Sequence, residues 1–146
     1  MKRFIFLGLI IVLIIGSCTQ EKKSPIEGAW KLVYGTAITK EQTFTFPDQF
    51  PWETIKILTK GHMIFIGQIK LPTDTVFKPQ YGWANYTLNG NKYEEIVKFH
   101  YIKGAIGSTI RMLMEVRNDT LIQKWPTDEN WKLPEKYETQ IYVRLD

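Results

Sequence analysis

Few side chains in this sequence are of the types that perform nucleophilic or acid–base chemistry. Beyond the first 18 residues the serines are Ser24 and Ser108, and neither lies in a segment that suggests a serine nucleophile with a histidine base. Glu94 and Glu95 are adjacent, and neighbouring residues on a strand point to opposite faces, so they cannot form a glycosidase carboxylate pair. We therefore predict no catalytic residues, with a weak enzyme using Tyr and His groups as an alternative.

The two histidines do not suggest a metal site. His62 follows a tight turn and His100 ends a long predicted strand, so we expect them at opposite ends of the domain. The spacings of His, Cys, Asp and Glu that hold zinc are missing from the sequence. The sequence predicts neither a metal nor any other cofactor.

The single cysteine, Cys18, follows an apolar segment at the start of the chain. Lys2 and Arg3 precede an unbroken apolar run over 4–16, and small residues come just before Cys18. A basic region, an apolar region and a small-residue cleavage site are typical of a secretory signal peptide. The run is shorter than the roughly 20 residues that a membrane-spanning helix needs.

The residues Ile15-Gly16-Ser17-Cys18 resemble the lipobox of bacterial lipoproteins. This resemblance implies that Cys18 receives a diacylglyceryl group, that the chain is cut before it and that the new amine is acylated. Two or more acyl chains attach a protein stably to a membrane. We predict a lipoprotein signal peptide over 1–17, a lipidated Cys18 with a tether over 18–26, and a domain over 27–146. The predicted location is the cell envelope, at the periplasmic face of a membrane or at the cell surface.

The remaining charge does not favour a nucleic-acid partner. The chain has 19 Lys and Arg against 15 Asp and Glu, and two of the basic residues, Lys2 and Arg3, belong to the predicted signal peptide. The others are not clustered as a nucleic-acid site requires. Because Cys18 is the sole cysteine, the exported domain must be stable without disulfides.

Turn signals at regular spacing, between segments rich in β-branched and aromatic residues, predict an all-β domain. The expected strands cover residues 28–36, 53–59, 62–69, 82–88, 92–101, 108–116, 120–125 and 138–145. Tight hairpins at Lys60-Gly61, Asn89-Gly90 and Arg117–Asp119 alternate with long connections. This order predicts an eight-stranded antiparallel up-and-down barrel, closed by hairpins at one end and fringed by long loops at the other.

Aromatic residues in the long connections suggest a ligand site, and two interpretations stay open. They are either a lid over an apolar cavity, or a plug in which "TFTF", residues 43–46, forms one more strand turn. Eight strands enclose a space that side chains fill or that holds one small ligand. The side chains expected to contact a ligand from these connections are Phe44, Phe46, Phe50, Trp52 and Trp131.

The segment "EGAWKLVYG", residues 27–35, resembles the G-x-W opening of the first strand in lipocalins, with Gly28 and Trp30 at the matching positions. In that family the tryptophan lies at the closed end, and an arginine of the last strand packs across it. Arg144 in "IYVRL" matches that arginine. The likeness extends in pattern over 28–145, including the hairpin from Tyr86 to Glu95 found in small bacterial lipocalin-like lipoproteins. It implies a lipocalin-like barrel.

Strand alternation predicts which side chains face inward. The expected inward residues include Trp30, Leu32, Tyr34, Ala84, Tyr86, Tyr93, Glu95, Val97, Phe99 and Tyr101. In the last strand hydrophobicity favours Ile141 and Val143, whereas the resemblance favours Tyr142 and Arg144, and we follow the resemblance.

An inward Glu95 requires a partner or a proton, and Arg144 is the cation expected near it. One interpretation is structural, with Arg144 paired to Glu95 or stacked on Trp30. The other is that Tyr142 and Arg144 bind a ligand carboxylate, as an Arg and a Tyr do in fatty-acid-binding relatives of lipocalins. Tyr86 completes the predicted ligand-binding residues.

The sequence therefore predicts a membrane-anchored, exported barrel that binds a small apolar or amphipathic molecule at its long-loop end. The alternative is a filled barrel that acts as a protein-interaction module with an envelope protein as its partner.

Overall fold

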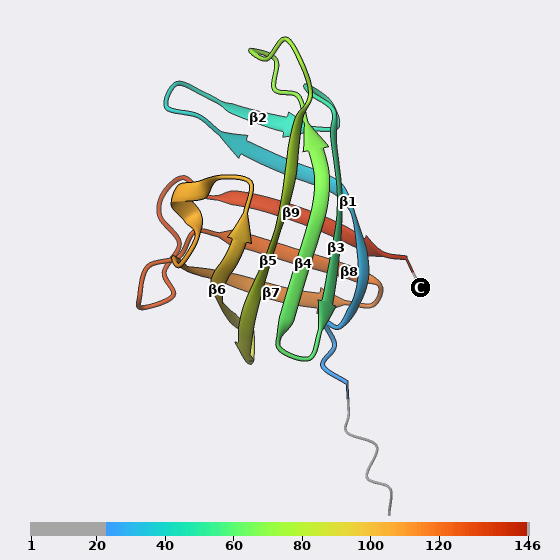
Figure 1. The fold of residues 1–146 in the computed structure, drawn as a ribbon, viewed down its shortest axis with the longest axis vertical. Coiled ribbons are helices and arrows are strands. Elements are labelled where there is room, and N and C mark those ends of the chain that lie inside the picture. The colour runs from blue at the N-terminus through green and yellow to red at the C-terminus, as the bar shows by residue number, and fades with distance from the viewer. Residues whose placement is uncertain (1–22, 146) are drawn as a thin grey trace, which may run out of the picture.

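A computed structural model describes residues 23–145 as an all-β barrel (Figure 1). Its elements are β1 (Gly28–Ile38), β2 (Thr43–Phe46), β3 (Trp52–Thr59), β4 (His62–Ile69), β5 (Lys78–Asn89), β6 (Lys92–His100), the 3-10 helix η1 (Lys103–Ala105), β7 (Thr109–Arg117), β8 (Thr120–Trp125) and β9 (Glu138–Arg144). Successive strands from β3 to β9 pair antiparallel, and β1 pairs with β3 on one edge and with β9 on the other. The result is a closed eight-stranded antiparallel barrel of the lipocalin-like kind, which confirms the predicted fold class.

Strand β2 is an addition to the eight predicted strands. Residues Thr43–Phe46 pair with the last part of β1, Gly35–Ile38. The expectation that "TFTF" adds a strand is therefore confirmed. Because β1 pairs with β3 only over Gly28–Lys31, β1 and β3 separate beyond Lys31.

The tight turns lie where the sequence predicts them. Gly61, Gly90 and Asn118 have φ of 75°, 62° and 53°, the left-handed region that glycine and asparagine tolerate in short hairpins. The β3–β4 and β5–β6 turns lie at the same end as the start of β1 (Figure 1). The long connections leave from the opposite end, as predicted.

Two irregularities in the ladders change which side chains face inward. The register shifts between Leu32 and Tyr34 in β1, and again beside Trp83 and Ala84, where β6 carries an extra residue. A bulge reverses the alternation beyond it. The predictions that Tyr34 and Phe99 point inward were therefore wrong: Tyr34 is opposite Ile141, and Phe99 is 49% exposed and stacks on Tyr81.

The hairpin end holds a well-packed core around Trp30, which is fully buried. The Trp30 Nε1–H donates to the carbonyl of Ile26 at 2.8 Å, and the guanidinium of Arg144 lies over the indole at 4.1 Å. Gly28 begins β1 beside this core with φ of 141°. Tyr142 is buried in β9, whereas Ile141 and Val143 are half-buried on the other face, as the resemblance predicted.

Within residues 23–145, no helix is both long and apolar enough to span a membrane.

Candidate ligand-binding cavity

The interior of the barrel is hollow toward the long-loop end. The cavity has a volume of about 380 Å³, within the range of roughly 300 to 1,000 Å³ that small-molecule sites occupy. Its walls are mainly apolar or aromatic, with Trp52, Met63, Phe65, Ile110, Met112 and Trp125 among the lining residues. Its polar side chains come from Thr54, Lys56, Gln80, Glu95, His100, Tyr101, Gln123, Glu138, Gln140 and Tyr142. An apolar wall with a few converging polar groups is typical of a site for a small molecule.

Lys56 is the cation of this cavity. It occupies an inward position of β3 and is only 6% exposed. Its Nζ donates to Gln123 Oε1 at 2.5 Å and lies 5.0 Å from the centre of the Tyr142 ring. The amide of Gln123 donates to Gln140 Oε1 at 3.3 Å, and the Tyr142 hydroxyl donates to the same oxygen at 2.6 Å. The network joins strands β3, β8 and β9.

Glu95 is a buried acid of the same cavity, also 6% exposed, and the half-buried Glu138 is a second acid in its wall. The Tyr93 hydroxyl donates to Glu95 Oε2 at 2.8 Å. Burial lowers the pKa of Lys56 to about 8, and the charge of Glu95 opposes that shift. Burial raises the pKa of Glu95, against the opposing charge of Lys56. At neutral pH the Lys56 amine is mostly protonated, because its pKa lies about one unit above 7.

Two further polar groups that line the cavity have no hydrogen-bond partner in the part of the chain that the structure describes. They are the Thr54 hydroxyl and the Trp125 Nε1–H. Buried polar atoms without a partner are uncommon in native proteins, and a bound molecule is one way to satisfy them. Both belong to strand segments that surround the cavity.

The rim of the cavity is polar and aromatic. The Trp52 Nε1–H donates to Gln80 Oε1 at 2.8 Å, and the Gln80 amide donates to the Tyr101 hydroxyl at 3.2 Å. His100 stacks on Tyr101 with ring centres 4.4 Å apart, and its Nδ1 accepts from the backbone N–H of Ile102. Burial lowers the pKa of His100. These contacts fix the aromatic rings at the mouth.

Of the eight side chains predicted to contact a ligand, the structure brings Trp52 and Tyr142 to the cavity wall. Phe44 and Phe50 are buried and Phe46 is half-buried, packed in an aromatic cluster behind Trp52. Phe50 stacks on Trp52 with ring centres 6.0 Å apart. None of these three phenylalanines lines the interior cavity.

The other three lie elsewhere. Trp131 faces Lys92, whose Nζ is 5.7 Å from the ring centre. Tyr86 stacks on Tyr93 at 4.9 Å, and its hydroxyl donates to the carbonyl of Thr59 at the hairpin end. Arg144 donates to the carbonyls of Glu27 and Pro25 at 2.8 and 3.0 Å.

The expected partner of Glu95 was wrong. Arg144 stacks on the Trp30 ring and donates hydrogen bonds to backbone carbonyls. The cation that interacts with Glu95 is Lys56. The sequence analysis did not predict Thr54 and Lys56 as cavity residues. The alternate residues Ile55 and Ile57 are more apolar, so hydrophobicity alone does not favour Thr54 and Lys56 as the inward positions of β3. The signal that could have found them is the inward position of Trp52, which alternation extends to Thr54 and Lys56.

His62 is exposed, with its Nδ1 3.0 Å from Asn85 Oδ1, and lies at the hairpin end. Between residues 23 and 145, no three His, Cys, Asp or Glu side chains are arranged to hold a metal ion.

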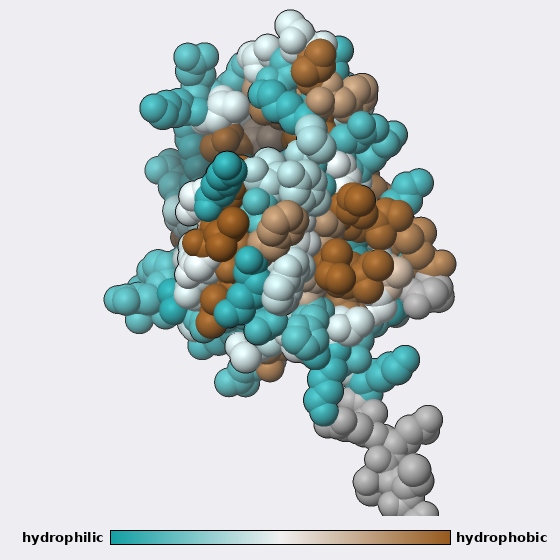
Figure 2. Space-filling view, viewed as in Figure 1, coloured by the Kyte–Doolittle hydropathy of each residue, from teal (hydrophilic) through white to brown (hydrophobic). Residues whose placement is uncertain are grey.

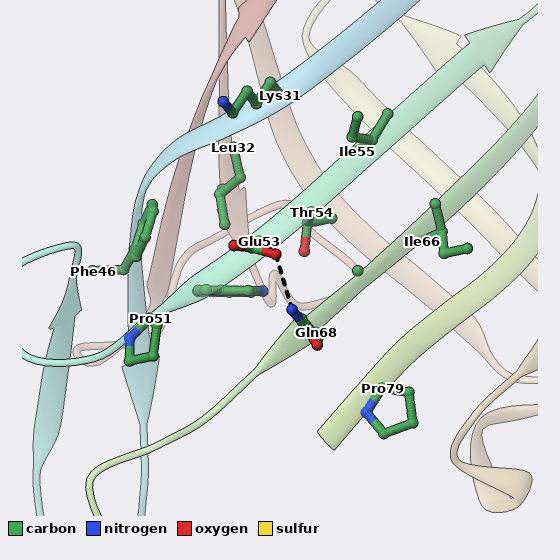
Figure 3. A pocket seen from close by; sticks show the side chains of 12 residues that line it. Lys31, Leu32, Phe46, Pro51, Glu53, Thr54, Ile55, Ile66, Gln68 and Pro79 are labelled. Atoms are coloured by element: carbon green, nitrogen blue, oxygen red, sulfur yellow. Dashed lines mark hydrogen bonds between the residues drawn. The ribbon is translucent and has the colours of Figure 1, made fainter. Parts of the chain in front are cut away.

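A second hollow, of about 710 Å³, lies on the side of the barrel where β1 separates from β3 (Figure 3). Leu32, Phe46 and Thr54 line it, together with Pro51 and Pro79 near its lower edge in the view. Glu53 accepts a hydrogen bond from the Gln68 amide at 2.9 Å across β3 and β4. Trp52 and Thr54 line both hollows, so they form the wall between this second hollow and the interior cavity.

The outer face of β3, β4 and β5 is unusually apolar. Ile55 lies opposite Ile66 and Ile57 opposite Ile64, and the next strand adds Tyr81 and Trp83. All six side chains are exposed, and Figure 2 shows apolar side chains gathered over the β3–β4 region. We call these six residues the outer apolar face.

The fold and the cavity together define a lipocalin-like barrel with a hollow interior. No known family model matches the chain, and no curated protein is significantly similar to it. The predicted signal peptide and the lipidated Cys18 lie outside the described residues.

Proposed function

We propose that this protein is a lipid-anchored, exported barrel that binds a small amphipathic molecule in its interior cavity. The observation that carries the proposal is the cavity of about 380 Å³, which combines apolar walls with buried polar groups. Anchoring through Cys18 follows from the likeness of residues 15–18 to a lipobox. The proposed location is the cell envelope.

Ligand binding is tested by titrating the purified domain with fatty acids, sterols, haem and flavins while following tryptophan fluorescence. Trp52 and Trp125 line the cavity, so at least one ligand class should give a saturable change. Trp52→Phe should diminish that change. Trp30→Phe is the matched control, because Trp30 is buried at the hairpin end and should contribute little. Absence of saturation with every class would contradict the proposal.

A second candidate function is docking of an envelope protein, and the outer apolar face favours it. Contiguous exposed apolar side chains on a soluble domain often mark an interaction site. Ile66 is 64% exposed and Ile64 is 52% exposed at its centre. A photoreactive residue at position 66 should then crosslink to one defined envelope protein in intact cells, and one at Thr87, exposed on β5, should not. Equal labelling from both positions would contradict docking.

A further inference from the structure

Three groups of the cavity that can donate hydrogen bonds have donor capacity that the described residues leave unused. An ammonium group has three N–H donors, and the hydrogen bond of Lys56 Nζ within the described residues is the one to Gln123. The Thr54 hydroxyl and the Trp125 Nε1–H have no partner in the same part of the chain. All three groups line one cavity. A bound molecule that carries acceptor oxygens would satisfy these donors.

We propose that the molecule bound in the cavity is an amphipathic organic acid whose head group is held by Lys56, with the Thr54 hydroxyl and the Trp125 N–H as further donors. The inference rests on the proposed ligand-binding function and specifies its chemistry. Charge-assisted hydrogen bonds to an acidic group are stronger than neutral ones, so the buried Lys56 dominates selection of the head group. The apolar part of the ligand lies against Met63, Phe65 and Met112.

The cavity holds two carboxyl groups that oppose an acidic ligand, Glu95 and the half-buried Glu138, and Glu95 is the one whose charge acts on Lys56. It lies in the same cavity, and its charge interacts with that of Lys56. Its carboxylate, which accepts a hydrogen bond from the Tyr93 hydroxyl, competes with an acidic ligand for the positive charge of Lys56. Replacing Glu95 by the neutral Gln should therefore strengthen binding of an acid, whereas a structural role alone would not predict a gain.

The test compares three probes with the same ten-carbon chain: decanoate, 1-decanol and decyltrimethylammonium. Binding to the purified domain is measured by calorimetry at pH 7, below the aggregation limit of each probe. We expect decanoate to bind about 10-fold more tightly than decanol, the factor that one charge-assisted hydrogen bond typically supplies. The cationic probe should bind most weakly.

Substitutions of cavity residues test which side chains give the selectivity for decanoate over decanol. Lys56→Met should lower decanoate affinity by about 10-fold or more and leave decanol affinity nearly unchanged. Thr54→Val, which keeps the shape of the side chain, should lower decanoate affinity several-fold, and Glu95→Gln should raise it. Lys98→Met is the matched control, because Lys98 is an exposed lysine on β6. If Lys56→Met does not fold, the changes in decanoate affinity of Thr54→Val and Glu95→Gln test whether the cavity binds an acidic head group.

The outcomes separate this inference from the function on which it rests. Equal affinity for decanoate and decanol, or tighter binding of the cation, overturns the acidic head group but leaves the cavity a ligand site. Selectivity for decanoate that survives in Lys56→Met overturns the assignment to Lys56. If none of the three probes binds, the proposed ligand binding fails, and this inference fails with it.

Discussion

The guanidinium of Arg144 lies 4.1 Å from the centre of the Trp30 indole, so the first and last strands of the barrel are joined by a cation stacked on an aromatic ring. The same guanidinium donates to the carbonyls of Glu27 and Pro25, just before β1. Arg144 is opposite Trp30 in the ladder that closes the barrel. The contact therefore stabilises barrel closure at the hairpin end rather than ligand binding.

The first prediction concerns this contact. Trp30→Ala should lower the free energy of unfolding by about 3 to 5 kcal/mol, the usual range for a large aromatic removed from a core. Arg144→Ala should cost less, and the double variant should cost less than the sum, because contacting residues are coupled. Urea denaturation of the four proteins measures this. Strict additivity of the two changes would contradict the contact.

The second prediction concerns pH and Lys56. Its pKa in the folded protein is about 8, below the ordinary lysine value of 10.5, so between these values the unfolded chain binds more protons than the folded one. The stability of the wild type should therefore rise with pH across this window, relative to Lys56→Met, by about 2 to 3 kcal/mol. Tyrosine ionisation is common to both proteins and cancels in the comparison. Denaturation at pH 7.5, 9 and 10 tests this, and a difference that does not change with pH would refute it.

The third prediction concerns the close approach of β3 and β4. A Cβ at Gly67 would lie 2.0 Å from the carbonyl oxygen of Glu53 and 2.6 Å from Thr54 Oγ1. Gly67→Ala should therefore lower the free energy of unfolding by at least about 2 kcal/mol. Gly104→Ala is the control, because a Cβ there meets no atom within 4 Å. Similar unfolding midpoints for the two variants would show that the strands are not packed this closely.

The fourth prediction concerns anchoring. Cys18→Ala should abolish incorporation of a radiolabelled fatty acid in the native cells, because Cys18 is the proposed acceptor. Ser24→Ala, in the predicted tether, should incorporate label as the wild type does. Label that persists in Cys18→Ala would rule out the lipoprotein assignment.

Much of the fold was predictable because turn chemistry and β-branched segments are local signals. The hairpins at Gly61 and Gly90 fix the strand boundaries, and their alternation with long connections fixes the barrel topology. The two bulges were not predictable, since the extra residue in β6 depends on its pairing with β5. For that reason the sequence placed Phe99 on the wrong face.

The cavity was harder to predict than the fold. The aromatic residues Phe44, Phe46 and Phe50 predict burial, but no local feature of the sequence shows whether their side chains line the cavity or pack away from it. Lys56 stands between Ile55 and Ile57, which are more apolar, yet both isoleucines are exposed and Lys56 is buried. Lys56 of β3 reaches Gln123 of β8 across the interior of the barrel, and Gln123 in turn bonds to Gln140 of the neighbouring strand β9. Such a contact between distant strands has no local signal in the sequence.

The most direct test of the central claim is native mass spectrometry of the protein purified from its own cells. If the cavity binds an amphipathic molecule, the spectrum should contain a species heavier than the protein alone by the mass of one small molecule. The added mass should be released on unfolding and absent from a variant in which Met112→Trp fills the cavity. A spectrum that contains only the mass of the protein alone, with no added species in either the wild type or the filled variant, would contradict the claim.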